Sequence, residues 1–422
     1  MAQAPQYAAG QRGFAGAQIT FKKHHQPTPQ RLRQHLAHGQ GRGFIGQVGS
    51  QGMILAMHGD IPTKDEQDWT ALASDIKRWA AELGFDAAQI GDADLGPAAA
   101  QNLQAWLAAD QHGEMDYMAS HGLKRARPAE LVPGTRRVIS LRMNYRAPDA
   151  HDSEAVLADG EAAFISRYAL GRDYHKVLRN RLQKLAERIQ AAGHALGYRA
   201  FVDSAPVMEV EAAMRAGLGW RGKHTLLLTR EHGSMFFLGE LFVSLPLPID
   251  PPLAQEHCGR CSKCIDICPT RAIVAPYRVD ARRCVSYLTI ELKGSIPAEF
   301  RPLIGNRVYG CDDCQLVCPW NRFAVDSSEA DFAVRNGLDA VSLVTLFGWS
   351  ETEFNQRLAG TAIYRIGHER WLRNIAVGLG NAPSTPAVLA ALQQRRDDAS
   401  ELVREHVAWA LQQHEARKVS GP

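Results

Sequence analysis

The chain has 422 residues, of which 45% are hydrophobic, and its 48 Lys and Arg against 45 Asp and Glu leave a net charge of +3. This length predicts two or three domains, each with a core of its own. The longest apolar stretches, near Met235 and Leu241, are broken by Glu240 and Pro246, well short of the ~20 residues that a membrane-spanning helix needs. We therefore expect a cytoplasmic protein that makes no contact with a membrane.

The first 59 residues hold ten Gly and no acidic residue, and no hydrophobic periodicity begins before Asp60. Such a composition cannot bury enough apolar surface to offset the entropy of ordering the chain. We expect residues 1–59 to form a disordered N-terminal extension. Our hypothesis is an over-extended translation start, with Met53 or Met57 as the first residue of the natural protein.

A first domain is predicted over residues 60–249, where helical and strand-like patterns follow one another. Apolar residues at helical spacing, followed by Gly84, predict a helix over Asp65–Leu83. The other predicted elements, in chain order, are a strand over Phe85–Ile90, a helix over Ala98–Leu107, a strand over Arg137–Tyr145, a helix over Tyr174–Leu196, a strand over Arg199–Asp203, a helix over Glu209–Ala216 and a β-rich stretch over Thr225–Leu245. The alternation indicates an α+β domain or one of α/β type, and it ends at a linker over Pro246–Pro252.

Two basic clusters lie in this domain. Residues 124–146 carry seven Lys and Arg against one acid, Glu130, and residues 167–188 carry seven against Asp173 and Glu187. Such clusters attract the phosphates of a nucleic acid or of a cofactor, but solvated helix faces have the same composition. Charge alone leaves both interpretations open.

Residues Gly217–His224 match the spacing of a phosphate-binding loop, but His224 occupies the position where magnesium needs Ser or Thr. The preceding residues are helical rather than strand-like, so the context also differs. We therefore discard nucleotide hydrolysis, and we expect the glycines to let the backbone approach a different large ligand.

Asp203 ends a strand of apolar residues, which is the place where α/β folds bind their ligands. Burial there would raise the pKa of its carboxyl group and make it a proton donor near neutral pH. The alternative is structural, because Asp203–Pro206 is also typical of a helix N-cap or an Asx turn. The residues alone slightly favour the structural alternative.

All eight cysteines lie between residues 258 and 318. They fall as Cys-x2-Cys-x2-Cys-x3-Cys-Pro, a single cysteine, and Cys-x2-Cys-x3-Cys-Pro, the first run having the spacing of bacterial ferredoxins. There three thiolates bind one cluster and the fourth binds a second, so eight thiolates suffice for two four-iron clusters. The division that this spacing favours is Cys258, Cys261, Cys264 and Cys318 on one cluster, and Cys268, Cys284, Cys311 and Cys314 on the other.

Zinc is the main alternative, because paired Cys-x2-Cys units also form structural zinc ribbons. A ribbon has no use for the third cysteine of the first run or for the two Cys-Pro endings, so we favour clusters. Disulfides are not expected in a chain long enough to form its own core. A ferredoxin-like domain with two [4Fe-4S] clusters is therefore predicted over residues 250–322.

Residues 323–422 are predicted to form a third domain of short helices, over Leu343–Phe347, Trp371–Leu379, Ala387–Leu392 and Val403–Leu411. The segments that begin at Arg373 and Arg404 are alike, which suggests HEAT-like repeats that must pack on the cluster domain. A candidate phosphate-binding surface comprises Arg365, His368, Arg370 and Arg373, although a plain solvated helix face is the alternative.

Five segments of the chain resemble the epoxyqueuosine reductases. They are Ser166–His175, Phe201–Pro206, Gly217–His224, Tyr287–Leu292 and Gly305–Pro319, and the resemblance extends over residues 65–415. It implies an enzyme that reduces the epoxide of epoxyqueuosine, at the wobble position of a tRNA, to an alkene with loss of water. It also implies cobalamin in the first domain, tRNA contacts by the helical third domain and an external electron donor. We expect a monomer.

The resemblance also implies roles for particular residues. Asp203 becomes the proton donor to the departing epoxide oxygen, and it lies where the family binds cobalamin. The other residues at positions where the family contacts cobalamin are Arg125, Ser166, Lys223, His224, Thr225, Leu227, Leu238, Ser286, Cys314 and Gln315. Cobalamin would store two electrons between the clusters, which deliver them singly, and the substrate.

Two other functions remain open from the sequence. A reductive dehalogenase shares cobalamin and clusters, but it acts on a small halocarbon and would not need a basic helical tail. An electron carrier would need only the cluster domain, which would leave the first domain unexplained. Salt-sensitive binding of tRNA would favour the reductase over both.

Overall fold

The structure is a computed structural model that describes residues 68–253 and 255–420. These residues belong to one unit, which runs from Lys64 to Pro422. The expected N-terminal extension, with its candidate start residues Met53 and Met57, lies outside the described residues.

A four-stranded sheet forms the centre of the first half of the described chain. Its strands, in order across the sheet, are β1 (Ala87–Asp92), β2 (Arg137–Asn144), β7 (Phe236–Val243) and β4 (Tyr198–Phe201). Every neighbouring pair is antiparallel, so the domain is α+β and the α/β type is wrong. The two central strands are buried along almost their whole length, which fits their content of Val, Ile, Leu and Phe.

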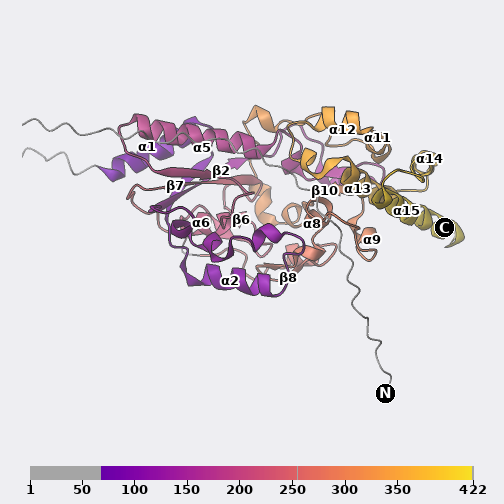
Figure 1. The fold of residues 1–422 in the computed structure, drawn as a ribbon, viewed down its shortest axis with the longest axis horizontal. Helices are drawn as coiled ribbons and strands as arrows, with labels where there is room; N and C mark the ends of the chain where they lie inside the picture. The colour runs from indigo at the N-terminus through magenta and orange to yellow at the C-terminus, as the bar shows by residue number, and fades with distance from the viewer. Residues whose placement is uncertain (1–67, 254, 421–422) are drawn as a thin grey trace, which may run out of the picture. The chain divides into compact units, whose positions relative to one another are not determined.

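Helices cover both faces of this sheet (Figure 1). On one face lie α1 (Trp69–Glu82) and α5 (Tyr174–Ala191), which contact each other. On the other face α6 (Glu209–Arg215) packs against β1, β2 and β7. The sheet is therefore shielded on both sides, and polar groups that it carries are buried beneath α6.

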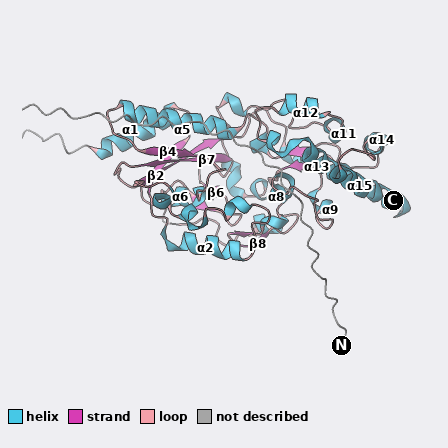
Figure 2. Ribbon diagram, viewed as in Figure 1, coloured by secondary structure: helices cyan, strands magenta, loops and turns pink. Residues whose placement is uncertain are grey.

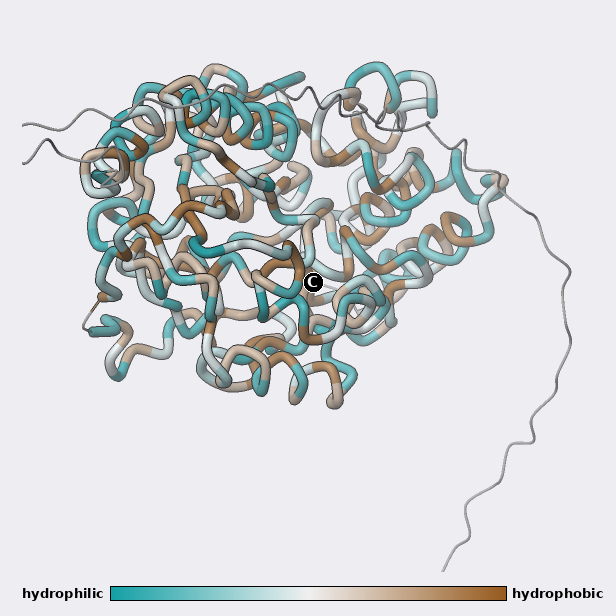
Figure 3. The backbone as a smooth tube through the Cα atoms, turned by 60° about the vertical axis from the view of Figure 1, so that its left-hand side comes forward, coloured by the Kyte–Doolittle hydropathy of each residue, from teal (hydrophilic) through white to brown (hydrophobic). Residues whose placement is uncertain are grey.

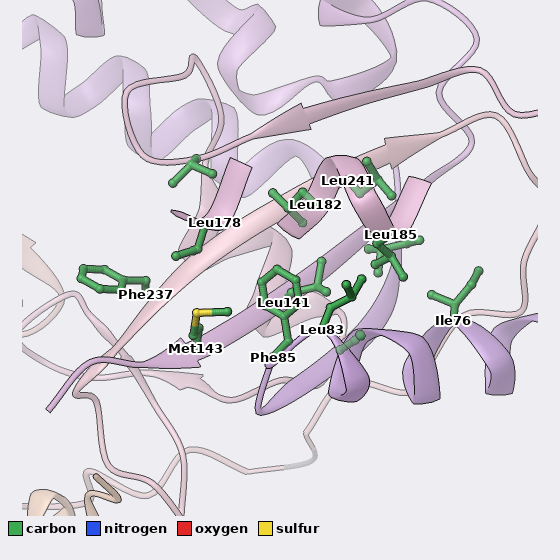
Figure 4. Packing of buried hydrophobic residues seen from close by; sticks show 14 of the residues in the cluster. Ile76, Leu83, Phe85, Leu141, Met143, Leu178, Leu182, Leu185, Phe237 and Leu241 are labelled. Carbon is green, nitrogen blue, oxygen red and sulfur yellow. The ribbon is translucent and has the colours of Figure 1, made fainter. Parts of the chain in front are cut away.

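The main hydrophobic core lies between the sheet and the helices α1 and α5 (Figure 4). Leu141 and Leu241 from the central strands meet Ile76 from α1 and Leu178 and Leu182 from α5, and all five side chains are buried. Burying a side chain of this size contributes roughly 1.5–3 kcal/mol. This core fixes α5 on the sheet and so positions the residues at its N-terminal end.

Capping residues explain where α1 and α5 begin and end. Asp68 caps α1 by accepting hydrogen bonds of 3.0 Å from the N–H groups of the second and third residues that follow it, so the helix begins later than predicted. Gly84 follows its end with a φ of +87°, as predicted. The predicted end of α5 at Leu196 is wrong, because Gly193 adopts a φ of +89° directly after the C-cap Ala192.

The other elements before residue 320 are mostly short (Figure 2). The helices are α2 (Gly96–Ala108), α3 (Pro128–Leu131), α4 (Ser153–Ala158), α7 (Lys263–Asp266), α8 (Val285–Ile290), α9 (Arg301–Ile304) and α10 (Asp313–Leu316). The strands pair as β3 (Phe164–Ile165) with β10 (Arg307–Tyr309), β5 (Trp220–Arg221) with β6 (Leu227–Leu228), and β8 (Ile273–Ala275) with β9 (Arg278–Val279). The parallel β3–β10 pair connects the segment before α5 to the cysteine-rich segment.

Five helices complete the described chain. They are α11 (Leu343–Phe347), α12 (Glu351–Leu358), α13 (Gly367–Asn381), α14 (Pro386–Gln394) and α15 (Glu401–Ser420). The four predicted helices are confirmed, although α13 and α15 are much longer than predicted. α13 and α15 approach so closely that a Cβ atom at Gly380 would lie 2.5 Å from the Trp409 ring. The assignment to HEAT-like repeats remains a prediction.

Hydrophilic and hydrophobic stretches alternate along the chain (Figure 3). Within residues 68–253 and 255–420, no helix has both the length and the apolar character that crossing a membrane requires.

Arg373 is buried, so its predicted place on a phosphate-binding surface is wrong. It lies on α13 with 0% of its surface exposed. Its guanidinium donates to the backbone carbonyls of Leu288, Leu292 and Gly294 over 2.7–2.9 Å. Burial lowers its pKa to about 9, so the group is still charged at neutral pH and ties α13 to the segment around the end of α8.

We expect Arg373→Met to destabilise the protein by about 3 kcal/mol, because the buried carbonyl groups of Leu288 and Leu292 and that of Gly294 lose their donor. Denaturant unfolding followed by circular dichroism measures this change, and Arg396→Met, at an exposed position, is the matched control. Equal stability of the two variants would contradict the structural role of Arg373.

Candidate functional site

A loop between β4 and α6 carries Asp203. The residue has a φ of +44°, a left-handed conformation that residues other than glycine seldom adopt. The N-cap of α6 is Met208, and no side chain caps that helix, so the interpretation of Asp203 as an N-cap is wrong. Its carboxylate instead contacts α5.

The N-terminal end of α5 supplies the partners of Asp203. His175 Nε2 lies 3.1 Å from Asp203 Oδ2, and His175 Nδ1 lies 2.8 Å from Asp173 Oδ1. The Tyr174 hydroxyl donates to the same oxygen of Asp203. Arg365, from the segment before α13, places its Nη1 3.2 Å from His175 Nε2. Residues far apart in the sequence thus meet around one imidazole ring.

Hydrogen bonds decide the charges in this group. Burial acts to lower the pKa of His175, but the hydrogen bonds with Asp173 and Asp203 outweigh it and raise the pKa. Burial acts to raise the pKa of Asp203, but hydrogen bonds from His175 and Tyr174 outweigh it and hold the pKa below its ordinary value. The expectation of a raised pKa for Asp203 is therefore wrong in this arrangement, which favours an ionised Asp203 beside a protonated His175.

Further side chains lie near Asp203. The Asp203 side chain is 56% exposed, although protein atoms also desolvate its carboxylate. Tyr117, Glu291 and Tyr309 come from three separate elements, and each has its pKa raised first by burial and also by the charge of Asp203. We call the surroundings of Asp203 that these three residues and Arg365 form the Asp203 recess.

Most residues around Asp203 were not predicted from the sequence. Tyr174, His175, Glu291 and Tyr309 all lie inside the segments that carry the family resemblance, and that position was the signal that could have found them. Tyr117 lies outside those segments, and no pattern in the sequence singled it out.

Two carboxyl groups lie behind the backbone of Asp203. Glu209 Oε1 accepts a hydrogen bond of 2.6 Å from the N–H of Asp203. Glu240, on the central strand β7, is 0% exposed, and no N–H or O–H group of the described residues donates to either of its carboxyl oxygens. Burial, and then Glu209, raise the pKa of Glu240 well above its usual range. Glu240 is therefore protonated and can donate to Glu209, which in turn holds the Asp203 backbone.

The first cysteine group, Cys258, Cys261, Cys264 and Cys318, lines one pocket of about 220 Å³ that is partly open to solvent. Burial, followed by the charges of the other three, raises the pKa of Cys264 to about 11. Four thiolates here would repel one another unless a cation lay between them. The described residues include no group of three or more His, Cys, Asp or Glu arranged around a single metal ion, and the four cysteines surround a hollow instead.

The second cysteine group, Cys268, Cys284, Cys311 and Cys314, lies deeper in the protein. Burial raises the pKa values of Cys311 and Cys314 well above the usual range, and Cys284 and Cys268 raise that of Cys314 further. The Cys284 sulfur accepts hydrogen bonds from the backbone N–H groups at the start of α8. The charge of Cys264 also acts on Cys314, so the two groups are neighbours.

Several residues expected to contact cobalamin have protein partners. Arg125 is buried and donates to the carbonyls of Tyr117, Met118 and Ala205. Ser166 donates to Asp312, and Gln315 donates to the carbonyl of Ser234 over 3.0 Å. These side chains shape the wall around the second cysteine group and the Asp203 loop.

The remaining residues expected to contact cobalamin lie in several places. Lys223 donates to the carbonyls of Gly259 and Cys261 and, with His224, lines the pocket of the first cysteine group. Leu227 and Leu238 pack in one hydrophobic cluster. Ser286 is half-buried on α8 near Cys284, and Thr225 has a φ of +77°.

Two family models match the chain. One, described as "Epoxyqueuosine reductase QueG, DUF1730", matches residues 125–204, and a "4Fe-4S double cluster binding domain" matches residues 257–321. The epoxyqueuosine reductase of Pseudomonas aeruginosa is 64% identical over 347 residues, which are 82% of this chain and 96% of that protein. The Escherichia coli enzyme of that name is 57% identical over 351 residues, covering 83% and 92%. The double-cluster domain confirms the prediction of iron–sulfur clusters over zinc.

Solved structures have the same fold. A crystal structure of epoxyqueuosine reductase with an epoxyqueuosine-modified tRNA-Tyr stem loop is 29% identical, has a TM-score of 0.75 and covers 82% of this chain and 91% of that chain. A Bacillus subtilis epoxyqueuosine reductase, in which the catalytic aspartate loop is swung out of the active site, is 27% identical with a TM-score of 0.74 and the same coverage.

We expect the free energy of unfolding to fall as the pH rises from about 4.5 to about 7, in part because of Glu209. Burial, and then Asp203, raise the pKa of Glu209 from 4.5 to about 7, so the folded protein holds a proton that the unfolded chain has already released. Glu209→Gln should make this decrease smaller in denaturant titrations at several pH values. Glu231→Gln, at an exposed position, should leave it unchanged, and the same result for Glu209→Gln would contradict the assignment.

Proposed function

Because this chain belongs to the epoxyqueuosine reductase family, we propose that it reduces epoxyqueuosine in tRNA to queuosine with electrons that pass from two [4Fe-4S] clusters through cobalamin. The chain is an oxidoreductase that acts on tRNA. The observation that carries the finer proposal is the presence of two four-cysteine groups in the same unit as the Asp203 recess. The overall reaction takes up two electrons and two protons, and it converts the epoxide to an alkene and water.

Each cysteine group would bind one cluster. Cys258, Cys261 and Cys264 would share theirs with Cys318, and this division is supported by the common pocket that the four residues line. Cys268, Cys284, Cys311 and Cys314 would bind the other cluster, since their thiols interact electrostatically. Iron would relieve the mutual repulsion of the thiolates.

Cobalamin, when bound, would supply a cobalt centre that stores two electrons beside the substrate. The chain has side chains that fit such a ligand. His224 has a buried Nε2 with no partner among the described residues, which is a group that a polar ligand satisfies. Leu227 and Leu238 would provide an apolar surface, Thr225 would contact the ligand from the same domain, and Ser286, Cys314 and Gln315 would contact it from the cluster domain. Arg125, Ser166 and Lys223 would hold the surrounding backbone in place.

His175 would supply the proton that Asp203 delivers. Its Nε2 lies 3.1 Å from Asp203 Oδ2, so the proton can move to the carboxylate as negative charge develops on the epoxide oxygen. Asp203 would then protonate the oxygen as the carbon–oxygen bond breaks, and a second proton would complete the water. Asp173 would keep the imidazole oriented, and Arg365 lies beside Asp173, with 3.8 Å between its Nη2 and Asp173 Oδ2. The Bacillus subtilis relative, with its catalytic aspartate loop, supports this role for the Asp203 loop.

The tRNA would present its modified base to the Asp203 recess. An anticodon loop can offer an unstacked base to a pocket, and its phosphates would meet exposed basic side chains. Arg365 is exposed at the recess, whereas Arg125, Arg142 and Arg167 of the two basic clusters are buried and would not take part. We further propose the domain boundaries 60–249, 250–322 and 323–422, with a monomer that receives electrons from an external donor.

Anaerobic reconstitution with iron, sulfide and cobalamin tests the cofactors. We expect about eight irons and one cobalt per chain, together with the visible absorption of four-iron clusters. Zinc in place of iron would contradict the clusters, and eight irons without cobalt would contradict cobalamin.

We expect Asp203→Asn to lower turnover of epoxyqueuosine-containing tRNA by about 100-fold or more, because asparagine has the same size but cannot carry the proton. Iron content, cobalamin binding and tRNA affinity should be unchanged. Asp149→Asn, at an exposed position, is the control and should retain full activity. An active Asp203→Asn enzyme would remove Asp203 from the mechanism.

A further inference from the structure

We propose that the rim of the pocket lined by the first cysteine group is the docking surface for an acidic protein that carries single electrons. The inference rests on the proposed function, since it requires a cluster in that pocket. It concerns the surface at which electrons enter the protein.

The first cysteine group is the one that lies at the surface. Cys261 is exposed, whereas every cysteine of the second group is at least half-buried. The pocket itself is partly open to solvent. Electron transfer slows steeply with distance, so a partner protein must deliver its electron to the cluster nearest the surface. The second cluster, next to the first, would then pass the electron inward.

The rim of this pocket is positively charged. Lys223, Lys263 and Arg322 line it, and its lining within the described part of the chain contains no Asp or Glu. Lys223 is held by two backbone carbonyls, but Lys263 and Arg322 are exposed. Arg230 extends the surface, because its guanidinium contacts the ring of His257, which also lines the pocket.

Apolar groups lie among these charges. Trp320 lines the pocket, and Phe323, three residues further along the chain, is 40% exposed. The Arg322 guanidinium lies over the Phe323 ring, 4.5 Å from its centroid. Aromatic residues and arginine are the types enriched where proteins bind one another. The rim therefore offers a small apolar centre with a cationic border, which fits an acidic partner.

A protein partner is favoured over the tRNA because different residues form the Asp203 recess and the pocket of the first cysteine group. Tyr117, Glu291, Tyr309 and Arg365 border the Asp203 recess, and none of them lines the pocket of the first cysteine group. The modified base and the carrier would therefore contact different residues.

Each encounter would transfer one electron and no proton. The reduced carrier, an iron–sulfur or flavin protein, loses one electron, and the first cluster gains it, its core changing from the 2+ to the 1+ state. Two encounters supply the two electrons that opening one epoxide requires. The two protons enter on the side of Asp203.

The test is the rate of cluster reduction in the reconstituted protein without tRNA, measured anaerobically by stopped-flow absorbance. One reductant is a reduced plant-type [2Fe-2S] ferredoxin, an acidic carrier, and the other is photoreduced deazariboflavin, a small molecule that needs no docking surface. The variant is Lys263→Glu combined with Arg322→Glu. Arg199→Glu, an exposed position outside the pocket lining, controls for a charge reversal elsewhere, and iron is counted in every sample.

We expect the double variant to retain its iron and to react with ferredoxin about tenfold or more slowly, because electrostatic steering is lost. Its reduction by deazariboflavin and its affinity for the tRNA stem loop should be unchanged. The wild-type reaction with ferredoxin should slow at high salt, and Arg199→Glu should behave as wild type.

Three results would overturn the proposal. An unchanged rate with ferredoxin would show that the rim does not steer the carrier. Equal slowing with both reductants would show that the cations only balance the charge of the cluster. A loss of tRNA affinity with an unchanged ferredoxin rate would make the rim an RNA surface.

A protein that holds no four-iron clusters would fail at the iron count, which separates failure of the proposed function from failure of this inference.

Discussion

A buried imidazolium needs carboxylates around it, and the candidate site depends on this requirement. His175 keeps its proton because Asp173 and Asp203 accept hydrogen bonds from its two ring nitrogens, whereas burial alone would favour the neutral ring. The same contacts hold Asp203 ionised. The position of the proton is therefore a property of the group rather than of one residue. Asp173 also caps α5. It therefore connects the start of that helix to the His175 ring and, through the ring, to the Asp203 loop.

Asp203 lies between the His175 ring on one side and the carboxyl groups of Glu209 and Glu240 on the other. On one side the charge of His175 stabilises the Asp203 carboxylate. On the other side Glu240 stays protonated, because no donor among the described residues compensates a charge in the core of the sheet. Glu209 connects the two through its hydrogen bond to the Asp203 N–H. This bond also helps to hold the left-handed backbone of Asp203, which would otherwise be costly. These contacts stabilise the loop conformation in which the Asp203 carboxylate meets His175 and Tyr174.

The cysteine groups and the recess depend on the same packing. The β3–β10 pair joins the segment before α5 to the cysteine-rich segment, and the buried guanidinium of Arg373 ties α13 to the residues around the end of α8. Every cysteine of the second group is at least half-buried, whereas the first group includes the exposed Cys261. This difference in depth gives the proposed path of electrons its direction.

The sequence by itself determined features that depend on neighbours along the chain. Cysteine spacing predicted iron–sulfur clusters, Gly84 predicted the end of α1, and local motifs indicated the family, because each signal is complete within a short segment. Tertiary structure alone decided the antiparallel order of the sheet, the burial of Arg373 and the charge of Asp203. These depend on contacts across 28 residues, as between His175 and Asp203, or across 190, as between His175 and Arg365. A pKa follows from the groups around a side chain in space, and no spacing rule contains them.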